Sequence, residues 1–138
     1  MTYQVLCAYD GSPSADKAFD FSVALTQAFQ GELHVLAVVQ PPEPAGDVET
    51  EALLESWQDR FDKDFERLRA RAAASGVKAA FEASVGHPAE QILFHADHLH
   101  IDHIVLGHRG KNAFKRWLMG SVSQRVISYA TSLVTVVR

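Results

Sequence analysis

The chain has 138 residues and a mass of 15.2 kDa, which is the size of one domain and too short for two. It is 47% hydrophobic and 22% charged, so it can bury a core and is not a low-complexity sequence. The single cysteine, Cys7, excludes an internal disulfide framework and fits a reducing cytoplasm. No uncharged apolar run is longer than a strand and the first residues are not basic, so we expect neither a membrane span nor a signal peptide.

The net charge of −4 is unevenly distributed. All 17 acidic residues lie in residues 1–102 with seven of the 13 lysines and arginines, which leaves that part at −10 and residues 103–138 at +6. An acidic chain is a poor general nucleic-acid binder, so we expect neither a nucleic-acid partner nor a membrane partner. The basic segment suits a small anion, but charge alone does not distinguish such a site from a solvated surface.

The first apolar run, residues 3–10, predicts a buried strand that ends in a turn. Ser12 is a suitable N-cap and Pro13 a suitable first helical residue, because proline lacks the N–H that would have no partner there. Apolar residues then recur at helical spacing and predict a helix over 13–29, which Gly31 is expected to end.

The next segments repeat this alternation. Residues 33–39 form a continuous apolar run, typical of a strand covered on both faces. After a Pro- and Gly-rich loop, residues 50–75 carry a helical stripe from Leu53 to Ala72 that we expect to be core. The same patterns predict strands at 78–85, 102–106 and 133–137, a helix after Gly86-His87-Pro88, and a last helix that begins at Gly120-Ser121 and runs to Ala130.

Strands that alternate with helices predict one α/β domain over residues 1–138, with a parallel sheet covered by helices on both faces. Right-handed crossovers leave few topologies for such a sheet. Where the strand order reverses, ligands bind beyond the carboxyl ends of the strands. The segments that follow the strands are therefore the places to look for a site.

The segment after the fourth strand carries the most information. Gly107 and Gly110 lie three residues apart and allow a tight turn with positive φ that brings backbone N–H groups to a ligand. Ten residues later, Gly120-Ser121 stands at the expected start of a helix, where free N–H donors suit phosphate. Spacing alone is equally compatible with plain turn glycines and an N-cap serine, and it matches neither a Walker A loop nor a Rossmann fingerprint.

The pattern Gly107-x2-Gly110-x9-Gly120-Ser121 resembles the nucleotide-binding signature of the universal stress protein family. VLCAYDGSPSADKAF and VGHPAEQIL resemble the first strand–turn–helix and the third strand with its turn, so the resemblance covers nearly the whole chain. It implies an open five-stranded parallel sheet in the order 3-2-1-4-5, a Rossmann-like fold of the adenine nucleotide alpha hydrolase-like type. It also implies an adenine nucleotide in the switch-point cleft.

Carried over by motif, the resemblance implies a set of nucleotide-binding residues. They are Ala8, Tyr9 and Asp10 beside the adenosine; Val38 beside the adenine; Gly107, Arg109 and Gly110 around ribose and phosphates; and Gly120, Ser121, Val122 and Ser123 at the phosphates. Asp10 is expected near the ribose or a phosphate-bound Mg²⁺. Tyr9 departs from the family pattern and either stacks on the ligand or crowds the pocket.

The last strand is an apolar edge strand in this order, and such an edge is normally covered. The family resemblance implies antiparallel pairing with a second copy through Leu133, Val134, Thr135, Val136 and Val137. We therefore expect a cytoplasmic, homodimeric, ATP-binding stress sensor or regulator, with Mg²⁺, whose nucleotide-dependent surface an unidentified regulatory protein recognises.

Two alternatives stay open at this point. One is a slow ATPase or self-phosphorylating enzyme that uses Asp10 or His108, since no positioned base for water is evident and turnover should be slow at most. The other is a nucleotide-free interaction or chaperone-like protein in which Tyr9 closes the pocket. A transition-metal site among the clustered histidines is not expected, because neither cysteine nor carboxylate completes a ligand set.

Overall fold

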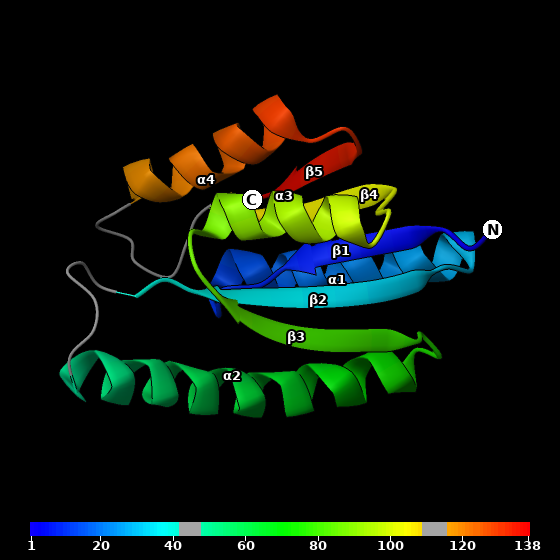
Figure 1. Ribbon diagram of the computed structural model, residues 1–138. Coiled ribbons are helices and arrows are strands. Elements are labelled where there is room, and N and C mark those ends of the chain that lie inside the picture. Colours follow the sequence, from blue (N-terminus) through cyan, green and yellow to red (C-terminus); the bar gives the residue numbers. More distant parts are fainter. Residues whose placement is uncertain (42–47, 109–115) are drawn as a thin grey trace.

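The computed structural model of the protein describes residues 1–41, 48–108 and 116–138, with the backbone alone at residues 48 and 116–119. Five strands alternate with four helices (Figure 1). In chain order the elements are β1 (Gln4–Ala8), α1 (Pro13–Phe29), β2 (Glu32–Val39), α2 (Val48–Ala74), β3 (Ala79–Val85), α3 (Pro88–His98), β4 (His103–Gly107), α4 (Arg116–Tyr129) and β5 (Leu133–Val137).

The strands form one parallel sheet in the order β3-β2-β1-β4-β5, which confirms the expected fold class and topology. Val5 of β1 pairs with Leu33 of β2 on one side and with His103 of β4 on the other. The order reverses between β1 and β4, so the switch point lies where these two strands end. All five carboxyl ends point to the left in Figure 1.

Each face of the sheet packs against two helices. Alternate residues of β1 contribute to different cores: Val5 and Cys7 belong to the core beneath α1 and α2, and Leu6 belongs to the core beneath α3 and α4. Burial on both faces explains why the central strands have continuous apolar runs rather than alternating ones. Among the described residues, no helix is long and apolar enough to cross a bilayer.

Helix α1 spans the residues that the sequence predicts, but the residue that ends it is not the expected glycine. The Ser12 hydroxyl accepts a hydrogen bond from the Ala15 N–H at 3.1 Å, as an N-cap does, and Pro13 is the first helical residue. The residue in the left-handed conformation at the end of the helix is Gln30, with φ of 52°, and not Gly31. Gly31 is needed for another reason: a Cβ there would collide with the carbonyl oxygen of Tyr3.

Candidate functional site

A cleft of about 510 Å³ opens at the carboxyl ends of the strands. The ends of β1, β2 and β4 form its base, and all four helices contribute walls. Most of the lining side chains are apolar, with a few polar groups among them. Pockets of this size and composition accommodate small flat ligands whose orientation a few polar groups fix.

Most of the residues that the family resemblance implies come together here. Residues from three strand ends and from α4 line the cleft, namely Ala8, Tyr9, Asp10, Val38, Gly107, Val122 and Ser123. Gly120 and Ser121 are not among the lining residues. Arg109 and Gly110 lie outside the residues that the structure describes.

Hydrogen bonds hold the Tyr9 hydroxyl against helices α1 and α2. Its hydroxyl donates to Asp16 Oδ1 of α1 at 2.9 Å and accepts from Arg67 of α2 at 3.0 Å, while the same Arg67 group donates to Asp16 at 3.1 Å. Tyr9 is 2% exposed, and its burial, together with the hydrogen bond to Asp16, raises the pKa of the phenol. The hydroxyl is therefore fixed to α1 and α2 while Tyr9 still lines the cleft, and its expected contact with the ligand stays a prediction.

Asp10 is the acidic residue among the described residues that line the cleft. Its Oδ1 accepts from the backbone N–H of Ser12 at 3.0 Å, which fixes the carboxylate at the turn between β1 and α1. Burial raises the pKa of Asp10, and the hydrogen bonds from Ser12 oppose that rise. Within the described part of the chain, no group of three or more His, Cys, Asp or Glu side chains is placed to hold a metal ion.

Gly107 is required by close packing and not by a left-handed turn. A Cβ at this position would lie 2.5 Å from Ser14 Oγ and 2.9 Å from the Ser14 carbonyl carbon, so the first turn of α1 sits directly against the end of β4. The expected positive φ is not found at Gly107; the described glycines with positive φ are Gly11, Gly76 and Gly86. The Ser123 hydroxyl donates to the Gly107 carbonyl at 3.5 Å and so joins α4 to the same point.

The predicted start of the last helix is wrong. Helix α4 begins at Arg116, so Gly120 and Ser121 lie in its second turn, where N–H groups have partners within the helix. The reason is that residues 116–119 have good intrinsic helix propensity and a single interior glycine does not stop a helix. A Cβ at Gly120 would meet no atom within 4 Å, so this glycine faces open space.

Comparison with known proteins agrees with this geometry, because residues 1–138 match the universal stress protein family. The chain belongs to the universal stress protein family. It is 34% identical to universal stress protein YxiE of Bacillus subtilis over the full length of both chains. It is 37% identical to a universal stress protein of Thermus aquaticus, over 97% of each chain. The structure of UspA from Lactobacillus plantarum superposes with a TM-score of 0.88 at 28% identity and covers 99% of this chain and 97% of that one.

Sequence reasoning missed one wall of the cleft in this universal stress protein. Trp57 and Phe61 of α2 line it, and Phe61 is also buried in the core as expected. The expectation that the whole stripe is core is wrong at its first residue, because Leu53 is 43% exposed. The sequence signal for this wall was the difference in length between helix α2 and strand β3. The 27 residues of α2 span about 40 Å, whereas the seven residues of β3 span only about 23 Å. The helix therefore extends beyond its strand toward the cleft, as Figure 1 shows.

Proposed function

We propose that this universal stress protein binds an adenine nucleotide in the cleft and acts as a nucleotide-dependent sensor or regulator. The observation that carries the proposal is the apolar cleft of about 510 Å³ at the reversal between β1 and β4, with Asp10 and Ser123 of α4 among its few polar lining residues. An apolar slot suits a flat base, and hydroxyl and carboxylate groups suit a ribose and its phosphates.

Proteins of the same fold support this ligand class. Structural neighbours include a universal stress protein in complex with cAMP (22% identical, TM-score 0.77) and one from Archaeoglobus fulgidus in complex with dAMP (18% identical, TM-score 0.71). A family protein from Arabidopsis thaliana carries AMP (16% identical, TM-score 0.69). At these identities the similarity establishes the fold alone, so the chemistry of the cleft is what favours an adenine nucleotide here.

In the proposed arrangement the base lies against Val38 and the ribose near Asp10. The phosphates reach toward Gly120, Ser121, Val122 and Ser123 of α4 and toward Arg109 and Gly110. ATP is the nucleotide that we propose, with Mg²⁺ as its counterion. One carboxylate at the cleft fits such an ion, because Mg²⁺ is commonly bound by one or two carboxylates, waters and the phosphates of the ligand itself.

The proposal includes a homodimer and a protein partner. The free edge of β5 is the surface that we assign to the second copy, and the surface around the bound phosphates is the one that we assign to a regulatory protein. Nucleotide binding then changes the surface that the regulatory protein contacts, so the protein acts through recognition and needs no hydrolysis of the nucleotide.

The test is a titration of nucleotide-free protein with Mg-ATP, AMP and GTP, followed by thermal unfolding. Ligand at about 100 times its dissociation constant adds about 2.7 kcal/mol of stability, which is a shift of several degrees for a chain of this size. Gly120→Glu should abolish the shift by placing a charge near the phosphates, and it should fold normally because a Cβ there meets no atom within 4 Å.

Ser128→Glu is the matched control, because it adds the same charge to an exposed position of the same helix. It should bind as the unaltered protein does. A well-folded protein whose unfolding temperature rises with none of these nucleotides would overturn the proposed function and favour an interaction protein.

A further inference from the structure

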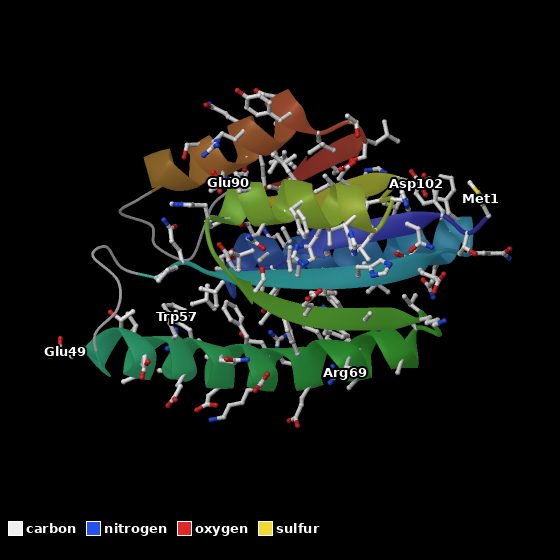
Figure 2. All side chains as sticks on the ribbon, viewed as in Figure 1. Met1, Glu49, Trp57, Arg69, Glu90 and Asp102 are labelled. Carbon is white, nitrogen blue, oxygen red and sulfur yellow. The ribbon has the colours of Figure 1, made fainter. Side chains whose placement is uncertain are left out.

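We propose that Trp57 contacts the base of the bound nucleotide and increases its affinity; this inference rests on the proposed function. The indole belongs to the part of α2 that extends beyond β3, and it lines the cleft beside Phe61. Figure 2 shows Trp57 on the side of α2 that faces the sheet, near the end of β2. Val38, against which we place the base, lies on that strand and lines the same cleft, with its side chain packed on the opposite face of the sheet from Trp57.

The indole is held in place by its neighbours. The ring centroids of Trp57 and Phe61 are 6.1 Å apart with planes 28° from parallel, and Phe61 is 3% exposed. The ring centroid of Phe61 in turn lies 6.2 Å from that of Phe65 in the core. The guanidinium carbon of Arg60 is 5.0 Å from the centre of the indole ring. A side chain positioned in this way loses little conformational entropy when a ligand arrives.

The chemistry favours contact with the base and not with the phosphates. Indole presents a flat apolar surface, and every nucleobase has a flat surface that can stack on it. We place the ribose near Asp10 and the phosphates near α4, on other walls of the same cleft. Trp57 should therefore raise affinity for a nucleotide while leaving affinity for its sugar phosphate unchanged.

The first readout is the fluorescence of Trp57 itself. The chain has two tryptophans, so Trp117→Phe leaves Trp57 as the sole indole emitter. In that protein, AMP should change the Trp57 emission with a dependence on concentration that matches calorimetric binding, whereas ribose 5-phosphate should not. AMP that binds by calorimetry without any change in the emission would overturn the inference.

The second readout is affinity by titration calorimetry. Trp57→Ala should weaken AMP binding at least fivefold, the low end of what a base–aromatic contact contributes, and Trp57→Phe should restore most of it. Leu53→Ala is the matched control, because it truncates an exposed apolar residue one turn earlier on α2 that does not line the cleft.

The outcomes separate the two proposals. If the unaltered protein binds AMP and Trp57→Ala, with a normal circular dichroism spectrum, binds it within twofold, Trp57 has no role at the base and the proposed function stands. If the unaltered, folded protein binds no adenine nucleotide, the proposed function fails and this inference fails with it.

Discussion

At the scale of single residues, two glycines of the same signature have opposite structural roles. Gly107 is surrounded, since a Cβ would approach both the hydroxyl and the backbone of Ser14. Gly120 is open, since its Cβ would meet nothing within 4 Å. Glycines of one sequence motif therefore need not share one structural role. Gly107 lets α1 approach β4, and Gly120 leaves space that we assign to a ligand.

Alanine should accordingly lower the stability at Gly107 and not at Gly120. Gly107→Ala should lower the free energy of unfolding by about 1–3 kcal/mol, because Ser14 must move to admit a methyl group. Gly120→Ala should leave it unchanged or raise it by up to about 1 kcal/mol, because alanine is preferred to glycine inside a helix. Urea unfolding of both variants measures the difference. Equal effects would contradict the packing described at Gly107.

The sequence predicted which residues line the cleft better than it predicted the contacts that hold them there. The family resemblance named Asp10, Val38 and Ser123, and all three line the cleft at the carboxyl ends of the strands; their contact with a nucleotide stays a prediction. It said nothing about the Tyr9 hydroxyl, because Asp16 and Arg67 that bind it come from two helices, seven and 58 residues away in sequence. Contacts between distant segments cannot be read from local patterns.

At the scale of elements, the amino ends of the strands carry a polar network far from the cleft. His103 of β4 lies 2.7 Å from Thr135 Oγ1 of β5 through Nε2 and 3.2 Å from the Tyr3 hydroxyl through Nδ1. His34 of β2 lies 2.7 Å from Gln4 Oε1 of β1. Burial lowers the pKa of both imidazoles, and Glu32 partly offsets the effect at His34. The neutral rings thus link neighbouring strands.

This network predicts that the folded state weakens in mild acid. In the unfolded chain both histidines have a pKa near 6.5, and in the folded protein it is lower, so the unfolded state binds more protons below that pH. The free energy of unfolding should therefore fall as the pH drops from 7.5 to 5, and urea unfolding across that range measures it. His103→Gln should reduce the slope and keep a side chain that can hydrogen-bond. His98→Gln, at an exposed position of α3, should not.

The elements themselves were predictable because their signals are local. Continuous apolar runs indicated β1, β2, β4 and β5, a weaker pattern indicated β3, and N-cap and proline chemistry placed the start of α1 at Pro13. Element ends were less predictable than the elements themselves. Gln30 takes the left-handed position at the end of α1, Gly31 is in close contact with Tyr3, and α4 begins one turn before the glycine that was expected to start it.

At the scale of the whole molecule, the two edges of the sheet differ in chemistry. The edge strand β3 carries the exposed charge of Glu82, and Lys78 immediately precedes it. Charged residues at an edge discourage pairing with another chain. The other edge strand, β5, has the sequence Leu-Val-Thr-Val-Val with no charge, and its Leu133 is 62% exposed. The difference favours β5 as the edge that a second copy covers, which is the homodimer that we propose.

The backbone of β5 shows which of its groups are free for such pairing. The Leu133 N–H donates to Asp102 O at 3.2 Å, and Val137 O accepts from the His108 N–H at 2.8 Å, so Leu133 and Val137 point their backbone groups at β4. Backbone groups alternate sides along a parallel strand, so Thr135 also faces β4. The groups of Val134 and Val136 therefore face the open edge.

Val136→Pro uses this alternation to separate assembly from folding. Proline removes an N–H that faces outward and leaves the ladder to β4 intact, a placement that edge strands tolerate. We expect light scattering to give a mass near twice 15.2 kDa for the unaltered protein and near 15.2 kDa for a folded Val136→Pro variant. Thr135→Pro should instead lower the unfolding temperature, because it removes an N–H that points to β4. A Val136→Pro protein that keeps the dimer mass would show that the copies meet elsewhere, since two β5 edges cannot pair fully without that donor.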